Sequence, residues 1–267
     1  MSIENQRSSR QKQRRWMLLF GFMTLVLLSG CAAESVRQGY NWAWWSVSPF
    51  TETGRRNLSF LAQGLVPTLS LTGAAFGISI PLGLIVSLIY FVPHRIAKSA
   101  NRIYVELLRS VPMLVMILWV YYGLPVSVGI DLNVFAAGVV ALALIDSAFE
   151  AEIFRGGIQS IAADQLETAR SLGLTSGQTL RYIVMPQAIR RILPPLGNRF
   201  VLMLKVSSLV SVIGAEELTR RANELTVSQY RPLEIYTVLI VEYLILVALA
   251  SAGVRYLERK LQSTYQE

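Results

Sequence analysis

The chain has 267 residues, of which 53% are hydrophobic and only 16% are charged, whereas soluble domains carry about a quarter of charged residues. This deficit of charge extends along the chain, argues against a soluble protein and indicates that lipid solvates much of it. The chain has one cysteine, which excludes an internal disulfide framework, and one histidine, which leaves little material for a metal centre. Its net charge is +8, and the basic residues lie between apolar segments. This placement favours cytoplasmic loops over a nucleic-acid-binding surface.

The first apolar segment, residues 16–33, carries no charge and allows two interpretations. It contains Leu28-Ser29-Gly30-Cys31, which resembles the lipobox of bacterial lipoproteins, where a leader is cleaved and the cysteine carries lipid. The apolar core is about a dozen residues long, nearer to a leader than to the roughly 20 residues of a full span. We expect the segment to be kept as the first transmembrane helix. Cleavage with lipidation of Cys31 is the alternative.

Five further segments have the length and apolarity of transmembrane helices. Pro67 and Pro81 lie in the first of these five and predict a kink or an interfacial first turn. With the segment described above, the sequence predicts an all-α membrane protein of about six transmembrane helices. The five segments cover residues 58–92, 104–128, 132–154, 200–215 and 235–254.

Basic residues mark every second connection, as the positive-inside rule requires of cytoplasmic loops. This pattern predicts that both termini are cytoplasmic. Trp42, Trp44 and Trp45 lie in an external connection, as expected for rings at a membrane interface. Two arginine pairs do not fit the pattern, Arg55 with Arg56 and Arg220 with Arg221. The arginines assigned to the cytoplasmic loop between the fourth and fifth spans are Arg155, Arg170, Arg181, Arg190, Arg191 and Arg199.

That loop has the pattern of two short capped helices rather than of a linker. Asp164 can cap the first helix, with Glu167 three residues later in the capping-box position, and Gly173 stands where a left-handed C-terminal residue is needed. Thr175 begins a second capping box, and Pro186 is expected to help end the second helix. A compact pair of helices on a cytoplasmic face suits the docking of a soluble partner, although packing against the chain's own bundle explains it as well.

At this point the sequence resembles a known family. The loop is similar to the EAA motif of permease subunits in binding-protein-dependent ABC importers, written E-A-A, three residues, G, nine residues, I-x-L-P. Glu167, Thr168 and Ala169 match its start, with threonine for the middle alanine, and Gly173 follows at the family spacing. Ile183 and Pro186 match the end of the motif, and the small Thr168 and Ala169 would allow close approach of another surface.

Three more segments resemble the polar amino-acid branch of that family, whose members carry substrates such as histidine, glutamine and glutamate. They occur in the family order, and together with the loop they cover roughly residues 60–260. The segments are YVELLRSVPMLV at 104–115, AEIFRGGIQSI at 151–161, and LPPLGNRFVLMLKVSSLVSVIGAEEL at 193–218.

The resemblance implies a type I ABC importer permease fold in which residues 164–172 form a cytoplasmic coupling helix. A separate ATPase subunit would receive this helix and bind the ATP, and no phosphate-loop motif occurs in the chain itself. The chain would therefore carry no catalytic residue, cofactor or metal. A second permease subunit, identical or related, and an extracytoplasmic amino-acid-binding protein would complete a transporter of the bacterial inner (plasma) membrane.

Ionisable side chains inside the spans are the candidates for the substrate path, because each is costly in lipid. Asp146 and Glu150 lie one turn apart in the fourth span and Lys205 lies early in the fifth. Asp146 and Lys205 can in principle meet the two charges of an amino acid. Alternatively, the three groups pair with one another and hold helices together. Ser207 and Ser208 are either ligand contacts or helix-packing residues.

Two other classes of protein remain to be weighed. An ATP-independent secondary carrier or channel would also have charged groups in its spans, but it has no need of the capped double helix. A membrane-anchored enzyme is disfavoured because His94 is isolated in a basic loop. The expected organisation is a basic cytoplasmic N-terminus (1–15), a first helix or leader (16–33), an external segment (34–60), a permease domain (61–260) with a coupling loop at 155–196, and a cytoplasmic tail (261–267).

Overall fold

The structure, a computed structural model, describes residues 42–161, 165, 168–169 and 171–263. The chain divides into two compact units, Met1–Ala43 and Trp44–Glu267, and the fold described below is that of the second. Its described residues are helical and contain no strand. The first expected span and Cys31 lie outside the described residues. The elements are η1 (Trp44–Val47), α2 (Glu52–Ala62), α3 (Leu65–Phe91), α4 (Arg95–Ser110), α5 (Met113–Leu118), η2 (Trp119–Gly123), α6 (Leu124–Val128), α7 (Val134–Gln159), α9 (Ser176–Thr179), η3 (Leu180–Val184), α10 (Met185–Val206), η4 (Ser207–Ile213), α11 (Leu218–Gln229) and α12 (Pro232–Ser263).

The prediction of an all-α membrane protein is confirmed. Within the described residues, four helical stretches are long and apolar enough to cross a membrane, and a bent pair of helices makes a fifth if it is counted as one span. The four stretches are Glu52–Phe91, Val134–Gln159, Ser176–Ile213 and Pro232–Lys260.

The third expected span, residues 104–128, is not a straight helix. The helix formed by α4 ends at Ser110, and the chain turns by 101° before α5 begins at Met113. Val111 and Pro112 have extended backbone angles, with ψ of 127° and 136°. The residue before a proline is biased away from the helical region, so Val111-Pro112 breaks the helix. The apolar residues that continue through α5 conceal this break in a hydropathy profile, whereas α4 itself carries charged residues such as Glu106 and Arg109.

The fifth expected span also differs, because α10 begins at Met185 rather than near residue 200. The expectation that Pro186 helps to end a helix is wrong. The Met185 N–H donates to the Leu180 carbonyl across a π turn, and Pro186 then occupies the first turn of α10, where a missing N–H costs nothing. Arg199 is therefore a residue of α10 and not of the loop.

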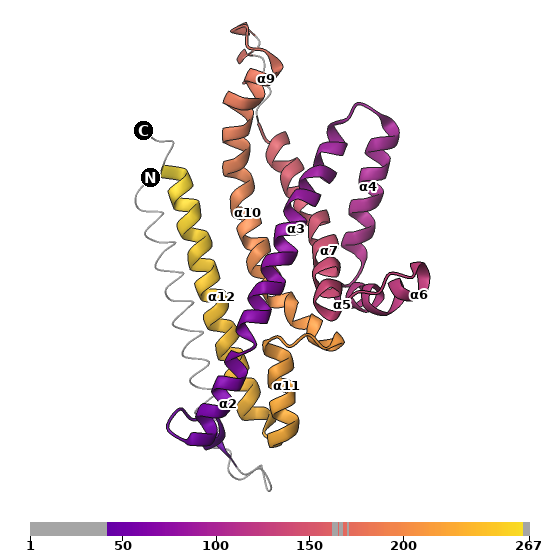
Figure 1. The fold of residues 1–267 in the computed structure, drawn as a ribbon. Helices are drawn as coiled ribbons and strands as arrows, with labels where there is room; N and C mark the ends of the chain where they lie inside the picture. Colours follow the sequence, from indigo (N-terminus) through magenta and orange to yellow (C-terminus); the bar gives the residue numbers. More distant parts are fainter. Residues whose placement is uncertain (1–41, 162–164, 166–167, 170, 264–267) are drawn as a thin grey trace, which may run out of the picture. The chain divides into compact units, whose positions relative to one another are not determined.

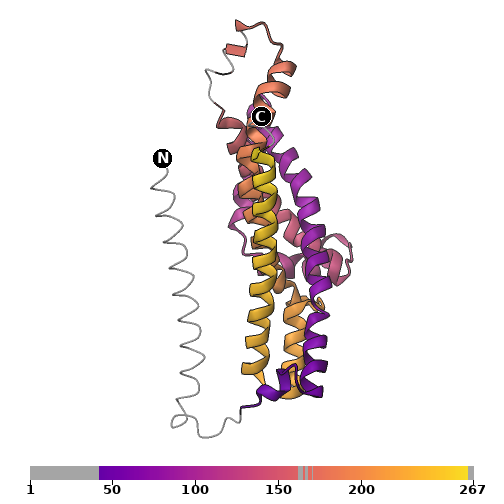
Figure 2. The same ribbon diagram turned by 90° about the vertical axis from the view of Figure 1, so that its left-hand side faces the viewer.

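Figure 1 and Figure 2 show which elements lie at the two ends of the domain. The short helix α9 and the loop before it project from one end, called here the loop end, while η1, α2 and α11 gather at the opposite cap end. A core of buried side chains that includes Leu61, Leu218 and Ile235 joins α2, α11 and α12 at the cap end. The long helix α12 packs along α10 and exposes an apolar surface that includes Ile245 and Leu249, as expected for a bilayer or a second subunit.

The centre of the domain is the packing of α3 along α7, which a glycine makes possible. A Cβ atom built on Gly83 would lie 2.8 Å from the Glu150 Cβ and 2.9 Å from the Ser147 carbonyl oxygen. Small residues allow membrane helices to approach closely, and here the close approach brings Ser79 of α3 to the buried Glu150 of α7.

Gly83→Ala is expected to destabilise the protein by about 1–3 kcal/mol, because the added methyl group forces two packed helices apart. Gly77→Ala on the same helix is the matched control, since a Cβ there meets no atom within 4 Å. Thermal melting of the two variants in detergent tests this expectation. Equal melting temperatures would show that the α3–α7 contact tolerates the methyl group.

Candidate functional site

The loop between α7 and α10 contains the helix end that the sequence predicts. Gly173 has a φ of +74°, and the Leu174 N–H donates to the Ala169 carbonyl at 3.0 Å. A left-handed glycine enclosed by this bond is the Schellman end of a helix, which glycine adopts without the strain of a Cβ. The glycine therefore fixes where the helix that precedes it stops.

The second capping box is also present as predicted. The Thr175 hydroxyl accepts from the Gln178 N–H at 3.3 Å, and the Thr175 N–H donates to the Gln178 side chain at 2.9 Å. These two bonds satisfy backbone donors at the start of α9. The two caps leave only Leu174 between the end of one helix and the start of the next.

Polar bonds and apolar contacts attach the loop to the bundle. The Gln187 side-chain amide of α10 donates to Gln165 Oε1 at 2.7 Å, and the Arg191 guanidinium donates to the Ser160 carbonyl. Ile161 packs in a core with Phe154 of α7 and side chains of α10. The loop therefore sits on α10, so a displacement of one displaces the other.

Three large apolar side chains of the loop are exposed, which the sequence reasoning did not single out. Leu172 is 75% exposed and Tyr182 is 65% exposed, and Leu180 is exposed nearby. Exposed side chains of this size suit a surface that another protein covers. The signal was available, since these residues interrupt an otherwise polar loop.

The residues assigned to the EAA-type motif do not share one environment. Thr168 is exposed, but Ala169 is completely buried against its own chain, so it does not form part of a surface that another protein approaches. Ile183 and Pro186 are half-buried at the base of α10. Asp164 and Glu167 lie outside the described residues.

Inside the bundle, Asp146 is paired with Arg199. The Arg199 guanidinium of α10 donates to Asp146 Oδ1 of α7, and the Asp146 side chain is only 2% exposed. The same guanidinium lies over the Phe149 ring, 4.1 Å from its centroid. Buried charge in a membrane protein is normally compensated by a partner, and here the pair joins two transmembrane helices.

The alternative that Asp146, Glu150 and Lys205 pair with one another holds only for Asp146 and Glu150, whose side chains interact on α7, and Lys205 is not part of this group. Glu150 is completely buried and accepts a hydrogen bond from Ser79 Oγ at 3.0 Å. Lys205 is exposed and lines a different region. Arg199 takes the role that the sequence suggested for the lysine, because α10 extends far enough toward the loop to place it beside Asp146.

Lys205 and Ser208 instead line a pocket of about 350 Å³ between the end of α10, α11 and α12. Two hydroxyl groups that the sequence did not single out lie in the same pocket, and the Thr219 and Tyr243 oxygens are 3.2 Å apart. Tyr243 also donates to the buried Glu217, which caps α11 and whose pKa burial raises above its usual value. The Lys205 ammonium group over an apolar floor suits an organic carboxylate, whereas the Ser208 and Tyr243 hydroxyls already donate to the Lys205 carbonyl and to Glu217.

Ser207 does not belong to that pocket. It is completely buried, and its hydroxyl donates to the Leu204 carbonyl at 2.9 Å. A serine that bonds back to its own helix is a packing residue, which is the second of the two interpretations that the sequence left open. Ser208 also bonds back to its helix, at 2.7 Å from the Lys205 carbonyl, but its side chain lines the pocket.

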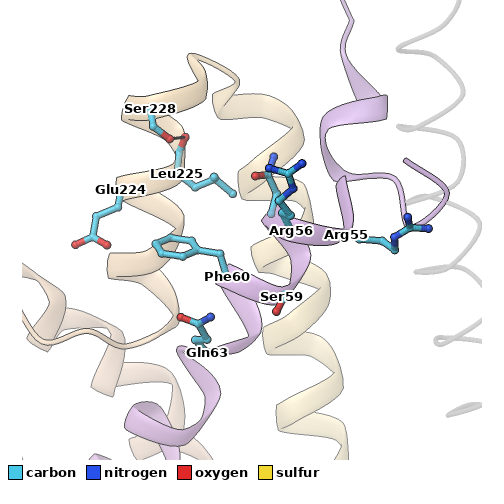
Figure 3. Close-up of a pocket in the computed structure, with 9 residues that line it drawn as sticks. Arg55, Arg56, Ser59, Phe60, Gln63, Glu224, Leu225 and Ser228 are labelled. Carbon is cyan, nitrogen blue, oxygen red and sulfur yellow. Dashed lines mark hydrogen bonds between the residues drawn. The ribbon is translucent and has the colours of Figure 1, made fainter. Parts of the chain in front are cut away.

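A larger pocket, of about 750 Å³, opens at the cap end between α2 and α11 (Figure 3). Phe60 lies between the two helices, and Arg55 points away from α11. Two of the charged groups that line it have partners, since Arg56 pairs with Glu52 at 2.5 Å and Glu224 pairs with Arg220 at 2.9 Å. Arg56 and Arg220, which do not fit the positive-inside pattern, each have a carboxylate beside them.

Comparison with known proteins agrees with this architecture. Residues 79–263 match the family described as "Binding-protein-dependent transport system inner membrane component". The chain is 36% identical over 209 residues to the probable glutamine ABC transporter permease protein GlnM of Bacillus subtilis (strain 168), covering 78% of this chain and 96% of that protein. It is 32% identical over 206 residues to the arginine transport system permease protein ArtQ of the same organism, covering 77% and 94%.

Solved structures agree with these relatives. The crystal structure of an amino acid ABC transporter with histidines superposes with a TM-score of 0.75 at 37% identity, covering 83% of this chain and 100% of that chain. The family match spans more than half of the chain and includes the loop, the Asp146–Arg199 pair and the Lys205 pocket. The chain belongs to the family of binding-protein-dependent transport system inner membrane components, the transmembrane permease subunits of ABC importers.

Proposed function

We propose that this permease translocates polar amino acids across the bacterial inner membrane, in a complex whose energy comes from ATP bound by separate subunits. The observation that carries the substrate class is its similarity, over nearly their whole length, to permeases named for glutamine and arginine. The permease itself has no phosphate-loop motif in its sequence, so it would bind neither ATP nor another cofactor.

The loop end is the proposed docking site for the ATPase. The capped helices, the exposed apolar residues Leu172, Leu180 and Tyr182, and the attachment to α10 support this role. Thr168 is exposed and would add a polar group to the docking surface, and Asp164 and Glu167 are proposed to take part in docking from the sequence motif alone. This arrangement places the loop in the cytoplasm, and with it both termini if the first apolar segment is retained.

The pocket at Lys205 is the proposed contact for the substrate carboxylate. Its ammonium group and the neighbouring Ser208 hydroxyl face a space of about 350 Å³ with apolar walls. Asp146 and Glu150 are less suited to direct contact, because both are buried and engaged with side chains of their own chain. They instead hold α3, α7 and α10 together around the path.

Lys205→Gln is expected to raise the KM for amino-acid uptake about 10- to 100-fold, since it removes a charge-assisted hydrogen bond to the carboxylate. Lys205→Arg keeps the charge and should restore most of the affinity. Ser208→Ala should weaken uptake, whereas Ser207→Ala should not, because only Ser208 lines the pocket. An unchanged KM in Lys205→Gln would place the carboxylate elsewhere.

The function is tested by reconstituting the permease in proteoliposomes with its ATPase, a second permease subunit and an extracytoplasmic binding protein. Uptake of labelled glutamine, arginine or histidine should require ATP on the loop side and the binding protein on the other. An ATP-independent secondary carrier would instead take up substrate without the ATPase and stop when an ionophore removes the membrane potential. Family membership argues against that alternative.

A further inference from the structure

A second polar pocket, distinct from the one at Lys205, lies between α3, α4 and α7 toward the loop end. It has a volume of about 210 Å³, and the two pockets share no residue. Three guanidinium groups and two carboxylates line it, from Arg102, Arg109, Arg155, Glu106 and Glu152. Water occupies about 30 Å³ per molecule, so the space corresponds to about seven waters, which is the size of a small metabolite.

One wall of this pocket is fixed by interactions within the protein. Arg155 donates to both oxygens of Glu152, at 3.0 and 2.8 Å, and to Gln159 at 2.8 Å. Its guanidinium also lies 5.1 Å from the centre of the Tyr90 ring. A fork-to-carboxylate pair of this kind holds both side chains in place, so Glu152 and Arg155 form a rigid wall.

The opposite wall carries charges that are barely engaged. Arg102 and Glu106 approach only to 3.9 Å, and their side chains are 78% and 73% exposed. Arg109 lies 3.8 Å from Glu152, which also accepts two bonds from Arg155, and its guanidinium lies 5.1 Å from the centre of the Phe149 ring. Exposed pairs at such distances contribute little, so Arg102 and Glu106, one turn apart on α4, can exchange partners with a ligand.

We propose that this pocket binds the transported amino acid on the loop side, with the carboxylate on Arg102 and Arg109 and the ammonium group on Glu106. Positive and negative side chains alternate around the pocket, so it favours a zwitterion, which carries one charge of each sign. A phosphate group would meet the carboxylates of Glu106 and Glu152 and be repelled. The inference rests on the proposed function, since the ligand is the same amino acid, and it adds a site where the product is held after translocation.

The test measures binding of tritiated glutamine and arginine to the complete transporter in nanodiscs, without the binding protein and with Lys205→Gln in every sample, so that the pocket at Lys205 does not contribute. Arg102→Gln combined with Glu106→Gln is expected to weaken the binding about tenfold or more. Arg95→Gln, on the same helix and outside the pocket, is the matched control. Arg102→Glu combined with Glu106→Arg preserves the net charge and should also lose binding, because a carboxylate then stands where the ligand carboxylate is expected.

Unchanged binding in the double glutamine variant overturns the proposal. The proposal also fails if amino-acid binding is unchanged and an anionic lipid copurifies with the wild type and Arg95→Gln but not with the double variant. Wild-type uptake separates this failure from failure of the proposed function. A transporter that takes up amino acids normally, yet binds them equally well with and without the Arg102–Glu106 pair, lacks only this second site.

Discussion

Arg199→Gln is expected to lower the free energy of unfolding by about 3–5 kcal/mol, because it leaves the Asp146 carboxylate buried without its partner. Glu150 lies one turn away on α7 and is completely buried, so the variant would leave two buried carboxyl groups without the Arg199 guanidinium. Melting of the purified protein in detergent measures this effect. It should be the largest loss among single substitutions of charged residues in the domain.

Two further variants isolate the cause. Arg220→Gln breaks an ion pair at the cap end whose N–O distance is 2.9 Å, but both side chains are more than a third exposed, so the expected cost is at most about 1 kcal/mol. Arg199→Gln combined with Asp146→Asn removes both charges and should recover part of the lost stability. If Arg199→Gln and Arg220→Gln have the same melting temperature, the Asp146–Arg199 ion pair does not hold α7 to α10.

The second large effect is expected at the loop. Gly173→Val should reduce uptake to background while ATP hydrolysis by the complex continues, since the helix before the glycine can no longer end where the ATPase is proposed to receive it. A β-branched residue is a genuine outlier at the φ of +74° that Gly173 adopts. The measurement compares uptake with ATP hydrolysis in the same proteoliposomes.

Gly177→Ala is the control for this loop variant. Gly177 lies in α9, has no left-handed φ, and a Cβ there would meet no atom within 4 Å. Coupled transport should therefore survive this change. Normal uptake by Gly173→Val would refute the docking role of the loop, whereas loss in both variants would point to general unfolding of the segment.

The loop could be predicted from the sequence because its determinants are local. A glycine at the helix end and a threonine three residues before a glutamine act within one turn of chain, and both motifs are present as expected. The apolar segments could be predicted equally well, because the length of a span follows from hydropathy. The local effect of two prolines was predicted wrongly, because Val111-Pro112 breaks the third expected span and Pro186 does not end a helix.

The interior could not be predicted in the same way. Asp146 and Arg199 are 53 positions apart, and their pairing depends on how far α10 extends before it reaches the apolar region. Charge counting placed Arg199 in a cytoplasmic loop, since an arginine without a known partner is excluded from lipid. The pocket at Lys205 likewise joins α10 to α11 and α12, whose contacts only the three-dimensional packing reveals.

The continuity of α10 has a mechanical consequence. Its 22 residues, at 1.5 Å each, form one helix of about 33 Å that carries Gln187 near one end, Arg199 in its second half and Lys205 near the other end, with Pro194 and Pro195 as the positions where it can bend. A push delivered by nucleotide closure to the loop would therefore arrive at the buried ion pair and at the candidate carboxylate site along one helix. The loop contact at Gln187, the buried ion pair at Arg199 and the candidate carboxylate site at Lys205 would then move together, because all three belong to α10.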